Sequence, residues 1–518
     1  MTAHSPVLLR RFAPFIAALA LLLGPIAWAD VTLPSLFSDH MVLQQDAPVP
    51  VWGWAAADEE VSVSIGDQTK TAKAGADGKW SLKLDALKAG EPTTLTVKGK
   101  NTITINDVLV GEVWLCSGQS NMGLQVQRAD NFEVEKAAAK YPKMRQFTVS
   151  SGGAKDIQDK CKGSWVVCAP ETVGGFSATA YFFGREVHKK TGQAVGLINS
   201  SVGGTAIESW TSWDAQKDKA EIKPIFDSWN KKQADYTPEK YKTNFAKQMA
   251  KWTEAEAKAK ADGKPLPRKP VLLTEPLLDH NHPANLFNGK INPLIPYAIR
   301  GAIWYQGEHN SGDAAMAAHY DVQMKTLISD WRTRWGAEFP FGIVQLPDYH
   351  PAQKDPSEPV GWVLVREGML KALSLPKTGM AVTLGCGLPD NVHPTNKQEV
   401  GRRLGAWALG DVYGMKDVAP SGPLPAGHEI NGAEVTLTFT HTDGGLVAKD
   451  GELKGFAIAG DDKKFAWAKA KIVGDKIVVS SPDVAKPAAV RYAWAANPQF
   501  NLFNGAGLPA TPFRTDNW

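Results

Sequence analysis

The sequence predicts an α/β protein whose parallel sheet is flanked by β-rich regions at both ends of the chain. The apolar runs VLVGEVWL, AVGLI and IRGAIW, which contain many β-branched residues, each stop at polar or glycine residues. This is the pattern of buried parallel strands that run into loops. A helical pattern separates the first two runs, and strand, helix, strand is the order of a parallel sheet. Short alternating runs before residue 108 and after residue 412 predict the flanking β regions.

Length and composition narrow the possible functions. A chain of 518 residues exceeds one hydrophobic core, so we expect about two to four domains. Because 57 basic residues nearly balance 54 acidic ones, a nucleic acid or an anionic membrane is disfavoured as a partner. The 18 tryptophans suit contact with sugar rings, although most tryptophans in proteins fill cores.

Residues 1–29 are expected to be a signal peptide. Arg10 and Arg11 precede an apolar stretch, and Ala27 and Ala29 occupy the small-residue positions that a signal peptidase reads. No later segment approaches 18 uninterrupted apolar residues, the length that would predict a membrane span. We therefore expect export to the periplasm or the extracellular space.

Residues 30–107 are predicted to form a small β-sandwich-like domain. The runs VPVWGW, VSVSI, KWSLKL and TTLTVKG are separated by turn residues. The expected role is a module that packs against the catalytic domain, and a carbohydrate-binding face is the alternative.

The first candidate catalytic residue, Ser120, follows the strand in VLVGEVWLCSGQSNM. In open α/β sheets ligands bind beyond the carboxyl ends of the strands, so a hydroxyl on this loop is well placed to be a nucleophile. The alternative is a polar turn after a core strand. The next predicted strand ends at Gly203 and Gly204, whose amides suit an oxyanion hole because glycine lets the backbone approach a ligand closely.

Residues 214–290 are predicted to be a helical insertion. AKQMAKWTEAEAKAKADGK is rich in Ala, Lys and Glu, and proline-bearing segments bracket it. Its charges are expected to form a solvated helix face.

The third strand ends in a polar cluster that contains Gln306, Glu308 and Asn310. The amide of Gln306 or of Asn310 is a candidate donor to an oxyanion, and Glu308 is expected to orient a neighbouring loop or to act as an acid. FGIVQL and GMAVTLGC are the fourth and fifth predicted strands.

The candidate base is His393, three residues after Asp390 in LPDNVHPTNKQEVGRR. A carboxylate at that spacing can accept the imidazole N–H and leave the other nitrogen to take a serine proton. His282 is the rival base. Thr395 and Gln398 predict a capping box for a helix that buries apolar residues, namely Val400, Leu404 and Trp407.

Cysteines and the remaining strands are less informative. The four cysteines allow three full disulfide pairings, which we leave open, and their spacing does not resemble a zinc site. Cys116 is expected to be an inert buried thiol. Residues 413–518 are predicted to form a β-rich domain, on the runs LTFTH, GFAIAG, KIVVSS and VRYAWA.

Four ordered blocks, CSGQSNM, INSSVGGT, WYQGEHN and PDNVHPTNKQEVGRR, resemble those of the sialate O-acetylesterase family of SGNH-type serine hydrolases. The resemblance covers nearly the whole mature chain. It implies a flavodoxin-like three-layer catalytic domain over 108–213 and 291–412, and hydrolysis of sugar O-acetyl esters without metal or cofactor. It further implies these roles: nucleophile, Ser120; base, His393; orienting acid, Asp390; oxyanion-hole donors, Ser120, Gly203, Gly204 and Gln306 or Asn310.

The predicted function is a secreted serine esterase that removes acetyl groups from a sugar or glycan, with 9-O-acetyl sialic acid as the expected substrate. The alternatives are acetylated plant polysaccharides such as xylan or xyloglucan, and carbohydrate binding without catalysis. A sialic acid carboxylate calls for a nearby Arg or Lys. Arg402 and Arg403 follow Asp390 and His393 on the predicted helix, but they are equally expected to form salt bridges inside the fold.

Overall fold

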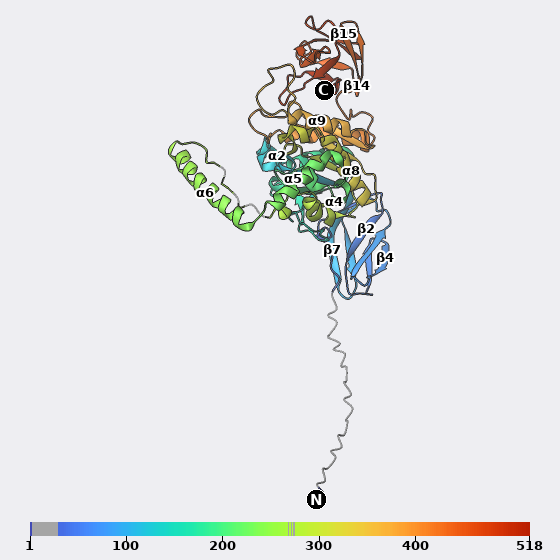
Figure 1. Cartoon of the computed structure of the whole chain (residues 1–518). Helices are drawn as coiled ribbons and strands as arrows, with labels where there is room; N and C mark the ends of the chain where they lie inside the picture. Colours follow the sequence, from blue (N-terminus) through green and yellow to red (C-terminus); the bar gives the residue numbers. More distant parts are fainter. Residues whose placement is uncertain (3–29, 268, 271, 273–274) are drawn as a thin grey trace.

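The computed structural model describes residues 1–2, 30–267, 269–270, 272 and 275–518. Residues 3–29 of the predicted signal peptide lie outside the described residues. The described chain contains a mixed sheet with parallel strands, helices that pack on it, and further β-rich regions at both ends (Figure 1). The predicted α/β class with flanking β regions is therefore confirmed. Within the described ranges, no helix combines the length and the apolar character needed to cross a membrane.

The central sheet has the strand order β13-β12-β11-β7-β10-β8-β9, and all neighbours in it are parallel except β8 and β9. Each of the five predicted strands corresponds to a strand of this sheet, whereas β8 and β9 were not predicted because neither has a long apolar run. The bounds are β7 Thr102–Gly118, β8 Tyr141–Thr148, β9 Trp165–Cys168, β10 Val195–Ser201, β11 Gly301–Tyr305, β12 Phe341–Val344 and β13 Thr378–Ala381.

Strand β7 joins the N-terminal β region to the parallel sheet. Its first residues pair with β6 (Thr93–Lys98), and its last residues pair with β10 and β11. The predicted boundary between residues 107 and 108 falls inside this one strand. The other strands of the N-terminal region are β1 Val42–Gln44, β2 Val49–Trp54, β3 Glu60–Ile65, β4 Gln68–Lys73 and β5 Lys79–Leu84.

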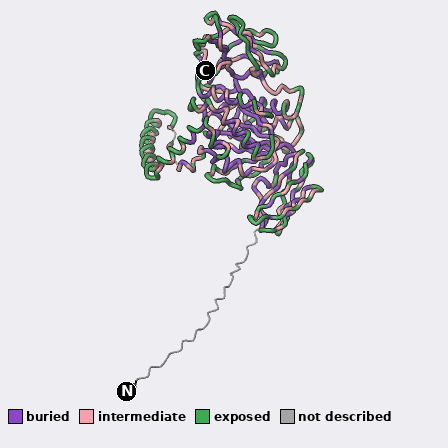
Figure 2. The backbone as a smooth tube through the Cα atoms, turned by 45° about the vertical axis from the view of Figure 1, so that its right-hand side comes forward, coloured by how far each residue is buried: buried purple, intermediate pink, exposed green. Residues whose placement is uncertain are grey.

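Helices cover both faces of the parallel sheet. Successive side chains of a strand point to opposite faces, so neighbouring residues of one strand belong to different cores. Trp114 of β7 belongs to the core that contains residues of α3 (Ala178–Thr191) and α10 (Lys397–Trp407). Its neighbour Leu115 belongs to the core with α8 (Tyr320–Trp335) and α9 (Gly361–Ala372). Figure 2 shows this buried interior in the middle of the molecule.

Helix α10 begins one residue later than the predicted cap implies. The N-cap is Asn396, whose side chain accepts a hydrogen bond from the Glu399 amide, so the prediction of a Thr395 cap was wrong. Asparagine caps helices at least as well as threonine, and both residues stand at this start. The predicted buried positions are confirmed for Val400, Leu404 and Trp407.

The segment after β10 contains α4 (Trp213–Gln216), α5 (Lys223–Ala234) and α6 (Pro238–Ala261). Helix α6 extends away from the body (Figure 1), and none of its residues is buried (Figure 2). The chain then returns to the body, where Phe287 and Ile291 are fully buried.

The C-terminal β region is attached to the α/β body by a buried arginine. The Arg366 guanidinium donates to the backbone carbonyls of Leu346, Pro347, Ala495 and Ala496. All four cysteines are free and buried. The strands of this region are β14 Leu424–Asn431, β15 Glu434–Thr440, β16 Leu446–Ala448, β17 Phe456–Ala459, β18 Phe465–Trp467, β19 Lys469–Val473, β20 Lys476–Ser480, β21 Ala489–Tyr492, β22 Leu502–Asn504 and β23 Phe513–Arg514.

Candidate active site

The turn after β7 is what presents Ser120 at the carboxyl edge of the sheet. Gly118 ends the strand with a φ of +138°, and a Cβ at this position would lie 2.1 Å from the Tyr305 carbonyl oxygen. Only glycine fits both the left-handed conformation and this close approach. The Gln119 amide then donates to the same carbonyl at 2.9 Å, and Ser120 begins the short helix α1 (Ser120–Gly123).

The structure brings His393 to Ser120 across 273 residues of sequence, with Nε2 at 2.7 Å from Oγ. This is the distance at which an imidazole accepts a hydroxyl proton. Burial lowers the pKa of His393, and the positive charges of Lys397 and Arg128 lower it further. The imidazole is therefore neutral at pH 7, which is the form that a general base requires.

Two residues that the sequence analysis did not single out hold the His393 loop in place. Asn121 Nδ2 donates to the Val392 carbonyl at 2.9 Å, and Lys397 Nζ donates to the Pro394 carbonyl at 2.5 Å. Lys397 Nζ also donates to Asn121 Oδ1 at 2.8 Å. The residues on both sides of His393 are thus fixed to the residue that follows Ser120. In the sequence, the position of Asn121 directly after the candidate nucleophile was the signal that could have identified this residue.

A buried acid completes this network. Glu308 Oε1 accepts a hydrogen bond from Asn121 Nδ2 at 2.5 Å, while Oε2 has no partner among the described residues. Burial raises the pKa of Glu308 and lowers the pKa of Lys397 to about 7. Each group's charge favours the charged form of the other, which opposes the effect of burial on the two pKa values. Asn121 is hydrogen-bonded to both groups and so joins them in one buried polar network.

The structure does not bring Asp390 to His393. The Asp390 side chain is exposed and makes no hydrogen bond or ion pair with the described residues, and His393 Nδ1 has no partner among them. Instead the backbone amide of His393 donates to Asn391 Oδ1 at 2.9 Å. The rival base His282 stacks on Trp213 and has no contact with Ser120.

Gln306 and Asn310 lie in a buried network that holds the glycine turn. Gln306 Nε2 donates to the Thr205 carbonyl at 2.8 Å and to Asn310 Oδ1 at 2.7 Å, which uses both of its N–H groups. Asn310 Nδ2 donates to Glu208 Oε2 at 3.0 Å. In this geometry the fully buried amide of Gln306 supports residue 205 and has no N–H left for an oxyanion, because both of its N–H groups already donate.

The backbone amides of Ser120, Gly203 and Gly204 each lack an acceptor in the described part of the chain. A Cβ on Gly203 would lie 3.4 Å from Ser120 Cβ, so this glycine borders the serine directly. Gly204 has a φ of +70°, and its carbonyl accepts a hydrogen bond from Asn281 Nδ2 at 3.3 Å. Unpaired amides grouped beside a nucleophile are what an oxyanion hole requires.

An unpaired cation lies near His393, and a cavity has one lining residue bonded to the segment that leads to His393. Arg128 is exposed and makes no side-chain hydrogen bond or ion pair with the described residues. Arg402 and Arg403, by contrast, both form salt bridges with Glu399. A cavity of about 520 Å³ is lined by Ser311, His350 and Trp362, among others. The His350 amide donates to the carbonyl of Pro389, which precedes His393 by four residues.

Comparisons with known proteins show which proteins this chain is similar to. Residues 110–259 and 287–409, more than half of the chain, match the family model described as carbohydrate esterase, sialic acid-specific acetylesterase. The chain is 29% identical to the sialate O-acetylesterase of Rattus norvegicus, over 92% of this chain and 93% of that protein. It is 28% identical to the Homo sapiens sialate O-acetylesterase, over 96% of this chain and 95% of that protein. A crystal structure of a carbohydrate acetylesterase from Xanthomonas citri is 35% identical, with a TM-score of 0.79, and the match covers 94% of this chain and 100% of that one.

The charge of Arg128 should be measurable at His393. We expect the imidazole pKa of His393 to lie below the ordinary value of about 6.5, and Arg128→Gln to raise it, because a nearby cation disfavours the protonated ring. The difference should shrink between about 0.01 M and about 1 M salt, since exposed charges are screened. An NMR titration, with His393→Gln to assign the signal, measures this. Arg402→Gln is the control, because Arg402 is paired with Glu399. An unchanged pKa in Arg128→Gln would contradict the assignment.

Proposed function

The chain belongs to the carbohydrate esterase family of sialic acid-specific acetylesterases, and we propose that it removes O-acetyl groups from sialic acids by way of an acetyl-serine at Ser120. The observation that carries the chemistry is the 2.7 Å contact between Ser120 Oγ and His393 Nε2 at the carboxyl edge of the sheet. Membership of this family supports the assignment of the protein as an ester hydrolase. We propose in addition that Ser120 is the nucleophile, that sialic acids are the substrate and that the catalytic mechanism is of the SGNH type.

In the first step, Ser120 Oγ attacks the acetyl carbonyl carbon while His393 Nε2 takes the hydroxyl proton. The carbonyl π electrons move to oxygen, and the amides of Ser120, Gly203 and Gly204 donate to the resulting oxyanion. The tetrahedral intermediate collapses, the bond to the sugar oxygen breaks, and His393 returns the proton to that oxygen. The sugar leaves as an alcohol.

In the second step, water attacks the acetyl-serine carbonyl and gives a proton to His393. The same amides stabilise the second oxyanion. Collapse breaks the bond to Ser120 Oγ, which His393 reprotonates, and acetic acid leaves and gives its remaining proton to the solvent to become acetate. Ser120 and His393 then have their initial protonation states again, so the cycle balances without a cofactor.

The unpaired cation favours an anionic substrate. A sialic acid carries a carboxylate, and Arg128 offers a guanidinium near His393 with no counter-charge of its own. Arginine binds carboxylates in a two-pronged geometry that fixes orientation as well as charge. An O-acetylated neutral glycan is the alternative substrate, and its acetyl ester would use the same Ser120 chemistry without Arg128.

We extend the proposal to location and organisation. The predicted signal peptide supports export to the periplasm or the extracellular space, where acetylated glycans are present. The proposed catalytic unit is 108–213 with 291–412, between a β region at 30–107, a helical insertion at 214–290 and a β region at 413–518. The continuity of β7 argues that the first of these β regions and the catalytic unit form one folding unit.

Acetate release tests the nucleophile and the substrate together. We expect the wild type to release acetate from 9-O-acetyl sialic acid faster than from acetylated xylan or xyloglucan, and Ser120→Ala to lower the rate by about 10⁴-fold or more. At about pH 8, where His393 is neutral in both proteins, Arg128→Gln should slow release from the sialic acid and leave release from the neutral glycans unchanged. Equal activity of Ser120→Ala would overturn the nucleophile. A preference for the neutral glycans would overturn the substrate, and no release from any substrate would favour a binding protein.

The contribution of Asp390 is a separate prediction. In a Ser-His-Asp triad, losing the orienting carboxylate lowers turnover by about 10⁴-fold. Because Asp390 is exposed and does not contact His393, the geometry predicts that Asp390→Asn lowers kcat by less than about tenfold. His393→Ala, measured beside it, gives the size of a full loss. If the two variants are equally impaired, Asp390 is the orienting acid, as the sequence predicts.

A further inference from the structure

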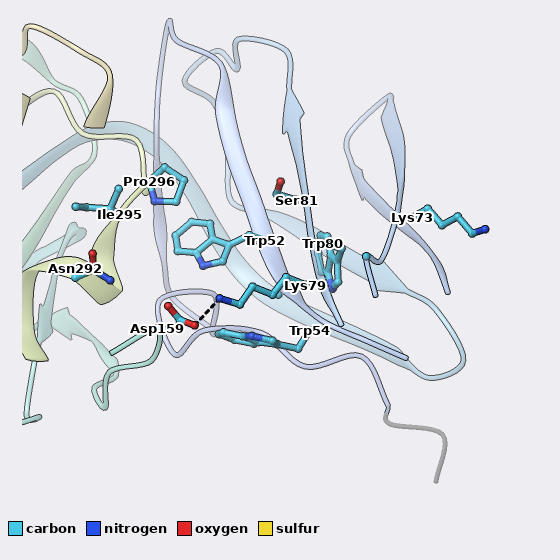
Figure 3. A pocket seen from close by; sticks show the side chains of 12 residues that line it. Trp52, Trp54, Lys73, Lys79, Trp80, Ser81, Asp159, Asn292, Ile295 and Pro296 are labelled. Carbon is cyan, nitrogen blue, oxygen red and sulfur yellow. Dashed lines mark hydrogen bonds and ion pairs between the residues drawn. The ribbon is translucent and has the colours of Figure 1, made fainter. Parts of the chain in front are cut away.

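The N-terminal β region borders a cavity of about 550 Å³ that faces the α/β body (Figure 3). Strands β2 and β5 form an antiparallel pair in which Trp52 lies opposite Ser81 and Trp54 lies opposite Lys79. Alternate residues of a strand share a face, so Trp52 and Trp54 are on the same side of β2, and both are half-buried. Asn292, Ile295 and Pro296 form the opposite wall.

The indole groups of this cavity have no hydrogen-bond acceptors. None of the N–H groups of Trp52, Trp54 and Trp80 donates to an acceptor in the described residues, and that of Trp80 is buried. Buried tryptophan N–H groups ordinarily have a partner. The side chains of Trp52 and Trp54 are only half-buried, so their N–H groups are open to a ligand that brings acceptor oxygens as well as apolar surface.

The charges on the lining are compensated. Lys79 Nζ lies 2.7 Å from Asp159 Oδ2, and Lys73 Nζ lies 2.9 Å from Asp58 Oδ1. An anionic ligand would therefore meet no unpaired cation among the residues of the lining itself. Lys160, outside the lining, places Nζ 4.0 Å from the centre of the Trp54 ring and occupies one face of that ring. A pyranose has C–H faces that stack on indole rings and hydroxyls that accept from N–H groups, and it carries no charge. We infer that this cavity binds neutral pyranose units of a glycan chain.

The cavity is separate from the active site. Ile295 and Pro296 precede β11 and so lie at the amino-terminal edge of the parallel sheet. Ser120 follows β7 at the carboxyl edge, which is the opposite edge because β7 and β11 are parallel. The site therefore attaches the protein to a glycan at a distance from the ester that is hydrolysed. This inference goes beyond the proposed function and does not require it, because binding would persist without catalysis.

Native gels that contain a polysaccharide test the inference on the full chain with Ser120→Ala, which removes turnover. We expect deacetylated xylan or xyloglucan to retard the protein and polysialic acid not to retard it by this site. Trp54→Ala should weaken binding by about tenfold or more, as expected for the loss of a stacking ring. The matched control is Trp467→Ala, since Trp467 is an exposed tryptophan far along the chain in β18.

A second variant keeps the test valid if Trp54→Ala is unstable. Ser81 is exposed and lines the cavity, so Ser81→Gln should obstruct the ligand without changing the core. Both variants should keep the wild-type kcat/KM on a small soluble acetyl ester when Ser120 is present. The inference is wrong if neither neutral polysaccharide retards the protein, or if Trp54→Ala and Ser81→Gln bind as Trp467→Ala does. It is also wrong if polysialic acid is bound equally well through Trp54. A retarded protein without esterase activity would instead overturn the proposed function alone.

Discussion

The close approach of Gly118 to the Tyr305 carbonyl is the constraint on which the proposed active site depends. Strand β7 is fixed along its length, by β6 in the N-terminal region and by β10 and β11 in the parallel sheet. The register of the strand is therefore fixed. The strand turns at Gly118, where any residue with a Cβ would place that atom 2.1 Å from the Tyr305 carbonyl oxygen. Ser120 stands two residues beyond that point, so the sheet itself determines where its hydroxyl lies.

The second requirement is that loops from different strand ends stay in register with one another. Buried polar side chains do this here in place of regular secondary structure. Asn121 and Lys397 tie the His393 loop to the serine turn, and Gln306 ties the end of β11 to the glycine turn. Each of these groups is costly to bury without a partner. The same burial lowers the pKa of His393, so the packing that positions the base also keeps it neutral.

Much of the fold and part of the site could be predicted from the sequence, and the difference has a physical cause. Ser120 and Gly203 were predictable because a buried strand that stops at small polar residues marks the carboxyl edge of a sheet. Strands β8 and β9 lack long apolar runs and were missed. The direction of the Gln306 amide depends on which neighbour accepts from it, which is a property of packing. Asn121 and Lys397 act through contacts between residues far apart in sequence. The position of Asn121 directly after Ser120 was the available local signal, and no local pattern indicates the role of Lys397.

The most direct test of the account is active-site labelling with a fluorophosphonate probe, followed by peptide mapping. The contact between Ser120 and His393 predicts one adduct, on Ser120, whose formation slows strongly in His393→Ala because the hydroxyl is no longer activated. An adduct on another residue, or labelling of Ser120 at the wild-type rate without His393, would contradict the assignment of these two residues as nucleophile and base.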